Sequence, residues 1–156
     1  MYKKISFLIV LIALLTLLSA CNDTHDDDDH LDIVGLEILL DGQPVVIQAR
    51  NPQSGQIEVD GTIDVVAGET SPMMTVVFKD PDGDNIVITD SDFSIEINPT
   101  STLEYNVYHD PSQARWGFMV EGKQEGDGII QISLLHGIHA DFESRPITVQ
   151  VHSSDD

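Results

Sequence analysis

The stretch F-S-I-E-I-N-P, residues 93–99, decides the fold class. Phe93, Ile95 and Ile97 alternate with polar residues, and Asn98-Pro99 ends the run. Successive side chains of a strand point to opposite faces, so a period of two predicts a strand with one apolar face and one polar face. A helix would need apolar residues every three or four positions. The stretch therefore predicts a half-buried β-strand.

The same alternation recurs on both sides of this stretch, between turns rich in Gly, Pro and Asp. Short strands that recur about every 8–12 residues are typical of a sandwich or barrel. The other segments with strand character are 36–40, 44–49, 57–65 with an interruption at Gly61, 74–78, 86–88, 105–107, 116–120, 130–134 and 147–151. We therefore expect an all-β domain, a single antiparallel β-sandwich of about nine short strands.

The order of these segments is similar to that of bacterial Ig-like modules. In such modules a Val-x-x-Gly stretch precedes a central strand, and a Gly-led strand and a V-x-V strand close the domain. Residues 65–68, 128–135 and 148–151 match these three places. The resemblance implies an Ig-like sandwich over residues 34–152. It is one of architecture only, because Cys21 is the single cysteine and no disulfide can form within the chain.

The first 20 residues have the features of a signal peptide. Lys3 and Lys4 precede an apolar run, 5–20, that is shorter than the ~20 residues of a membrane-spanning helix. Leu18-Ser19-Ala20-Cys21 resembles the lipobox of bacterial lipoproteins, which implies cleavage before Cys21 and lipidation of its side chain. The alternative is a plain secretory signal with a free cysteine. Asn22 stands where many inner-membrane lipoproteins carry Asp, so the resemblance favours the outer membrane, at its periplasmic face or the cell surface.

The remaining chain is strongly acidic. The sequence has seven basic and 27 acidic residues; without Lys3 and Lys4 five basic residues remain, a net charge of −22. Such a surface repels nucleic acid and attracts cations, so nucleic-acid binding is excluded. Residues 21–33 hold four consecutive aspartates, which repel one another and predict a disordered tether. Residues 153–156 form an acidic tail.

His136, His139 and Asp141 are the main candidate metal ligands. His136 continues the parity of the apolar positions in 130–134, whereas His139 has the opposite parity. Gly137 can turn the chain by adopting a positive φ, which would allow the three side chains to converge. Imidazole and carboxylate suit Zn²⁺, and imidazole also suits Cu²⁺ and Ni²⁺. The alternative is structural: His136 bonds a backbone carbonyl at the strand end, and His139 pairs with Asp141 at the surface.

Three further histidines are candidate ligands. His25 and His30 flank the four aspartates 26–29, and short His-rich acidic tracts are typical of metal binding. A solvated spacer between the membrane and the domain is the alternative for this tract. His109 falls at the end of another expected strand.

A family resemblance involves the same histidines. The His/Asp-rich start combined with L-L-H-x-x-H-x-D-F, residues 134–142, and S-x-P-I-x-V-x-V, residues 144–151, resembles a group of small bacterial lipoproteins. The resemblance implies that the histidines are a feature of the group. The resemblance implies no activity.

The turn D-P-D-G-D-N, residues 80–85, is a second metal candidate. Asp80, Asp82 and Asp84 are spaced like the first three ligands of an EF-hand loop, which binds Ca²⁺. However, Asn85 stands where that loop requires glycine, and Ser91 stands where it requires glutamate. A hairpin turn built on Pro-Asp-Gly is favoured over a weak calcium site.

Enzyme motifs are missing from the sequence: it has no G-x-S-x-G and no H-E-x-x-H. His139-Ala140-Asp141 resembles part of the H-x-H-x-D-H motif of metallo-β-lactamase-like hydrolases, but Gly137 and Phe142 replace two of its histidines. We therefore expect a binding protein that captures Zn²⁺, or Cu²⁺ or Ni²⁺, for scavenging, buffering or delivery to an envelope transporter or surface protein. The alternative is a metal-free structural or adhesion module that binds a partner.

Overall fold

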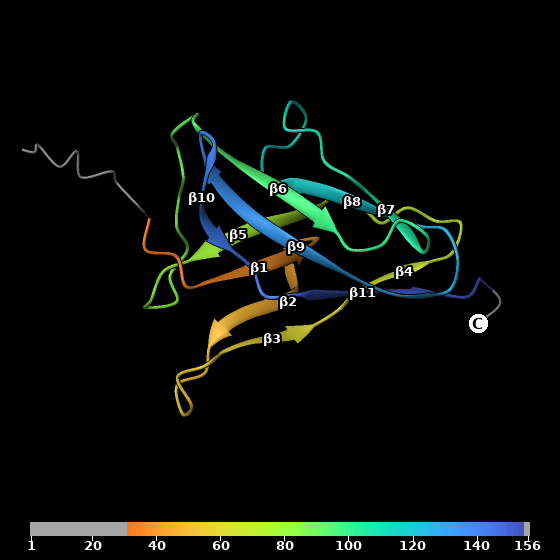
Figure 1. Ribbon diagram of the computed structural model, residues 1–156, viewed down its shortest axis with the longest axis horizontal. Helices are drawn as coiled ribbons and strands as arrows, with labels where there is room; N and C mark the ends of the chain where they lie inside the picture. The colour runs from red at the N-terminus through yellow and green to blue at the C-terminus, as the bar shows by residue number, and fades with distance from the viewer. Residues whose placement is uncertain (1–30, 155–156) are drawn as a thin grey trace, which may run out of the picture. The chain divides into compact units, whose positions relative to one another are not determined.

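Two packed β-sheets make up residues 31–154, the part of the chain that the computed structural model describes (Figure 1). The strands are β1 (Gly35–Leu40), β2 (Gln43–Arg50), β3 (Ile57–Gly61), β4 (Ile63–Val66), β5 (Met74–Lys79), β6 (Phe93–Pro99), β7 (Tyr105–Tyr108), β8 (Gly117–Gly122), β9 (Gly126–His136), β10 (His139–Glu143) and β11 (Ile147–His152). The expected all-β sandwich is confirmed, with eleven strands rather than about nine. The predictions for Cys21, His25 and His30 fall outside the described residues. Within 31–154 no helix has the length and apolar character to cross a membrane.

The two sheets differ in their number of strands. The first sheet has six strands in the order β3-β2-β1-β5-β8-β7. The second has five: four in the order β10-β9-β11-β4, and β6, which also pairs with β9. All pairs are antiparallel except β11 with β4. The long strand β9 is the centre of the second sheet, because β6, β10 and β11 all pair with it.

Apolar side chains from both sheets fill the space between them. Ile130, Ile132 and Leu134 of β9 are fully buried, as the alternation predicted. Burying a side chain of this size contributes about 1.5–3 kcal/mol, so the interior is the main source of stability. The other buried apolar residues are Leu36, Ile38, Val46, Ile63, Val65, Met74, Val76, Phe78, Phe93, Ile95, Tyr105, Phe118, Val120, Ile147, Val149 and Val151.

Gly61 explains why the segment 57–65 is interrupted. β3 pairs with β2 in the first sheet, whereas β4 pairs with β11 in the second, so the chain changes sheets at this residue. Gly61 has a φ of 91°, and a Cβ on it would lie 2.0 Å from the carbonyl oxygen of Val45. Both features require glycine.

Two details differ from the sequence prediction. The segment 86–88 is not a strand; Asn85 forms one isolated bridge with Lys79, and the backbone N–H of Ile86 donates to the carbonyl of Phe78 at 2.9 Å. Conversely, residues 139–143 form β10, which the sequence did not predict. β10 matters for function because it carries His139 and Asp141.

Candidate metal centre

The hairpin between β9 and β10 brings His136 and His139 together. The two residues are direct cross-strand partners in the antiparallel ladder, separated by the turn Gly137-Ile138. Gly137 has a φ of 61°, the conformation that its expected role in turning the chain requires. Directly opposite residues project from the same face of a sheet, with Cβ atoms about 4.5–5.5 Å apart. The glycine turn therefore places the two histidines opposite each other in the ladder.

His136 is held flat against a buried aromatic ring. It is also the cross-strand partner of Phe93 in β6, and the two rings stack with centroids 4.3 Å apart and an angle of 6° between their planes. Arg115 in turn donates to the carbonyl oxygen of Phe93 from Nε at 3.1 Å and from Nη2 at 2.6 Å. The stack fixes the plane of the imidazole, and its edge carries both ring nitrogens.

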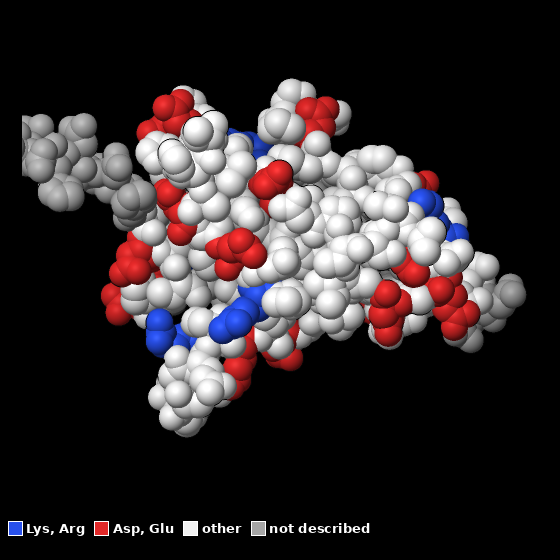
Figure 2. Space-filling view, viewed as in Figure 1, with Lys and Arg blue, Asp and Glu red and all other residues white. Residues whose placement is uncertain are grey.

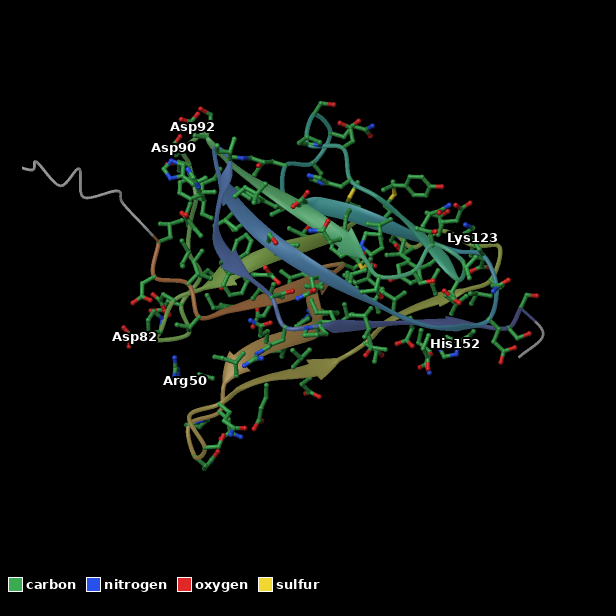
Figure 3. The ribbon with its side chains drawn as sticks, in the orientation of Figure 1. Arg50, Asp82, Asp90, Asp92, Lys123 and His152 are labelled. Carbon is green, nitrogen blue, oxygen red and sulfur yellow. The ribbon has the colours of Figure 1, made fainter. Side chains whose placement is uncertain are left out.

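Two aspartates lie near the turn of this hairpin. The backbone N–H of Gly137 donates to the carbonyl oxygen of Asp92 at 2.9 Å, and Figure 3 shows Asp90 and Asp92 at the same end of the molecule as the hairpin. Far more Asp and Glu than Lys and Arg are visible on the face drawn in Figure 2. The negative charge of these residues raises the local concentration of cations.

Asp141 does not join the two histidines in a three-residue site. The ladder shifts between Ala140 and Phe142, which makes Asp141 the extra residue of a β-bulge. Its Oδ2 atom is buried. Residues 31–154 contain no group of three or more His, Cys, Asp or Glu side chains that could hold a metal ion. The expected convergence of His136, His139 and Asp141 is corrected to a pair of imidazoles, because the bulge separates the carboxylate from the ladder positions.

The turn 80–84 is a structural turn. Oδ1 of Asp80 accepts the backbone N–H groups of Asp82 at 2.9 Å and Asp84 at 2.8 Å. Gly83 has a φ of 87°, and its N–H donates to the carbonyl of Asp80 at 3.0 Å. One oxygen of Asp80 is thus bound to the backbone of its own turn, as in an Asx turn. The turn is therefore closed by its own hydrogen bonds, although no strand of residues 31–154 follows directly to complete a hairpin. The weak calcium site stays a prediction.

His109 lies in a different part of the molecule, in the loop after β7. Its Nδ1 atom is 2.8 Å from the carbonyl oxygen of Gly117. A pocket of about 400 Å³ opens beside it, lined in part by Met73, Tyr108 and Met119. Neither methionine stood out in the sequence, because positions 73, 109 and 119 share no local motif. Alternation marked Met74, next to Met73, as a core residue, and Met74 is indeed buried.

Among known proteins, this chain is similar only to solved structures. The chain matches no family model and no curated protein sequence. Domains 4 and 5 of the S-layer protein SbsC match with 16% identity over 74% of this chain and 74% of that chain, with a TM-score of 0.42. Domains 5–6 of SbsC match with 21% identity over 62% and 43% and a TM-score of 0.43. The Lin-41 filamin domain matches with 15% identity over 60% and 86% and a TM-score of 0.31.

Proposed function

We propose that this chain is a cell-envelope lipoprotein that binds a divalent transition-metal ion, Zn²⁺ or else Cu²⁺ or Ni²⁺, at the β9–β10 hairpin. The cross-strand pairing of His136 with His139 carries the proposal. Two neutral imidazoles on one face supply two nitrogen ligands of the kind that these ions prefer. Scavenging, buffering or delivery to an envelope transporter or surface protein are the roles that such a site serves, and none of them requires catalysis.

Two features favour binding at this pair. The stack on Phe93 holds the His136 ring before the metal arrives, so less conformational entropy is lost on binding. Water fills the other coordination positions, and His25 and His30, which flank four aspartates, stay separate candidate ligands. Asp90 and Asp92 lie at the same end of the molecule as the hairpin, and their negative charge attracts cations.

The test is a thermal unfolding series of the full chain with Cys21→Ser, which removes the thiol as a competing ligand. The midpoint rises with micromolar Zn²⁺, by the equivalent of about 2.7 kcal/mol at a hundredfold excess over the dissociation constant. His136→Ala with His139→Ala abolishes the rise. His152→Ala is the matched control: this surface histidine pairs with Asp64 at 2.9 Å, so its loss leaves the response to Zn²⁺ unchanged.

The tether is tested separately with His25→Ala and His30→Ala. These variants retain the midpoint rise if the hairpin alone holds the metal ion that stabilises the domain. An equal midpoint rise in wild type and in the hairpin double variant would refute the hairpin site and leave only the tether.

A metal-free, partner-binding module is the second candidate function, and a groove on the first sheet favours it. β5 pairs with β8 only at Met74 and Thr75. Beyond these residues a pocket of about 280 Å³ opens, and Ile86, Ile88 and Trp116 are among the residues that line it. Val87 beside it is 82% exposed. If neither Zn²⁺, Cu²⁺ nor Ni²⁺ shifts the midpoint of the wild type, this alternative replaces the metal-binding proposal.

A further inference from the structure

The pocket beside His109 is built from three separate segments of the chain. Tyr108 of β7 is the cross-strand partner of Met119 in β8. On the other side of β8, Met74 pairs with Phe118 and Thr75 with Gly117, and Met73, which precedes Met74, lines the same pocket as Met119. Met74 and Phe118 are buried, so Met73 and Met119, which follow the opposite parity, lie on the outer face of the sheet and line one pocket. Sulfur atoms, drawn in yellow, are visible along β8 in Figure 3.

Gly117 brings the imidazole to the same place. A Cβ on Gly117 would lie 2.8 Å from Sδ of Met73, so this sulfur is packed directly against the glycine. The carbonyl oxygen of the same glycine is 2.8 Å from Nδ1 of His109. One residue thus contacts both a thioether and the imidazole, and any larger residue at position 117 would push the thioether out of this position.

The bond to Gly117 also settles which nitrogen of His109 is available. A carbonyl oxygen only accepts, so Nδ1 carries a proton, and in the neutral ring Nε2 then carries the lone pair. Metal-binding histidines commonly donate their second ring nitrogen to a backbone carbonyl in this way, which fixes the ring and leaves the other nitrogen for the metal. His109 therefore has the arrangement of a ligand before any metal is bound.

The loop that carries His109 is held by its own hydrogen bonds. Asp110 accepts from the backbone N–H of Ser112 at 3.0 Å and from the side chain of Gln113 at 2.9 Å. Its carbonyl oxygen accepts from the backbone N–H of Ala114 at 3.0 Å. These bonds close a helical turn immediately after His109, so the position of the imidazole does not depend on a ligand.

The donor set is soft. Thioether sulfur is uncharged and polarizable, and it favours Cu⁺ over Zn²⁺, Ca²⁺ or Mg²⁺. Val107 forms an apolar side of the pocket, and the two carboxylate oxygens of Asp110, which also lines it, already accept hydrogen bonds from Ser112 and Gln113. We propose that Met73, Met119 and Nε2 of His109 form a binding site for a monovalent soft cation, Cu⁺, with Ag⁺ as its redox-inert equivalent. This site is separate from the hairpin of His136 and His139, and it stands whether or not the hairpin binds metal.

The experiment is an anaerobic titration of the full chain with Cu⁺ buffered by a chromogenic chelator, in the Cys21→Ser background. Wild type removes one equivalent of Cu⁺ from the chelator. Met73→Leu with Met119→Leu lowers the affinity at least tenfold, because the leucines keep the volume and lose both sulfurs. Met74→Leu is the matched control: Met74 is 2% exposed in the core, and its replacement leaves Cu⁺ binding unchanged.

A second measurement uses the wild type alone. On addition of Ag⁺, the methionine methyl NMR signals of Met73 and Met119 shift, and the signal of Met74 stays in place. The hairpin variant His136→Ala with His139→Ala still binds Cu⁺ with the wild-type affinity, so this site and the hairpin site can fail independently. Equal Cu⁺ affinity of wild type and the Met73/Met119 double variant, or methyl shifts confined to Met74, would overturn the proposal.

Discussion

The substitution Gly128→Ala separates the effect of packing from that of backbone propensity. Gly128 lies in β9, opposite Val149 of β11, and its φ is outside the left-handed region. Alanine is less flexible than glycine in the unfolded chain, so the backbone alone predicts a gain of about 0.4–1 kcal/mol. Packing predicts the opposite sign. A Cβ on Gly128 would lie 2.2 Å from Cε1 of Tyr105 and 3.0 Å from both Cζ and Oη.

The magnitude follows from what Tyr105 can do in response. Its side chain is fully buried, and its hydroxyl donates to the carbonyl oxygen of Ile129 at 2.7 Å. Forcing extra volume into a packed core costs about 1–3 kcal/mol. A shift of the ring also weakens the hydroxyl bond, which contributes about 0.5–1.5 kcal/mol. We expect Gly128→Ala to lower the free energy of unfolding by about 3 kcal/mol, or the thermal midpoint by roughly 10 °C.

Urea unfolding followed by tryptophan fluorescence measures this loss, because Trp116 is the single tryptophan. Tyr105→Leu removes the ring, so Gly128→Ala costs less in that background than in the wild type, and the difference is the energy of the clash. A Gly128→Ala variant as stable as the wild type, or equal costs in the two backgrounds, would refute the reasoning.

Three other predictions concern stability and location. Burial raises the pKa of Tyr105 above its ordinary value of 10.0. The stability that the neutral phenol contributes is therefore complete below about pH 10 and is lost as the pH rises through the folded-state pKa. Urea midpoints measured at increasing pH show this alkaline loss in the wild type, and Tyr105→Phe reduces it. Ser144→Ala leaves the buried N–H of Ile132 without the Oγ acceptor at 2.9 Å and costs about 1–3 kcal/mol, whereas Ser144→Thr, which keeps the hydroxyl, costs less in the same assay. Cys21→Ser moves the protein from the membrane fraction to the soluble fraction of the expressing cell, and an unchanged distribution would contradict a lipid anchor.

The strands that the sequence predicted are those with regular alternation. β6 and β9 both alternate over at least five residues, and both have buried apolar faces. β10 lacked this signal, because it contains only Phe142 as a large apolar residue and a bulge interrupts its ladder. The segment 86–88 carried the signal without forming a strand; Arg115, distant in sequence, binds the carbonyl oxygens of Asp90 and Phe93 beside it. Tertiary contacts of this kind leave no mark on local periodicity.

The candidate sites were predictable to different extents. Gly137 marked a turn, and the spacing of His136 and His139 around it gave their pairing. The position of Asp141 depended on a β-bulge, which has no reliable sequence signal. The pocket beside His109 could not be predicted, because it depends on the pairing of β5, β7 and β8 and on the close contact of Met73 with Gly117.

The segment 109–117, which links β7 to β8, has contacts to both proposed sites. At one end His109 bonds to the carbonyl of Gly117, which also packs against Met73. In between, Arg115 stacks 4.6 Å above the ring of Trp116 and binds the carbonyl of Phe93, the residue on which His136 rests. An arginine with several fixed hydrogen bonds and an aromatic neighbour is well ordered. The segment therefore contacts both sites: His109 bonds directly to Gly117, and Arg115 binds the backbone of the residue on which His136 stacks.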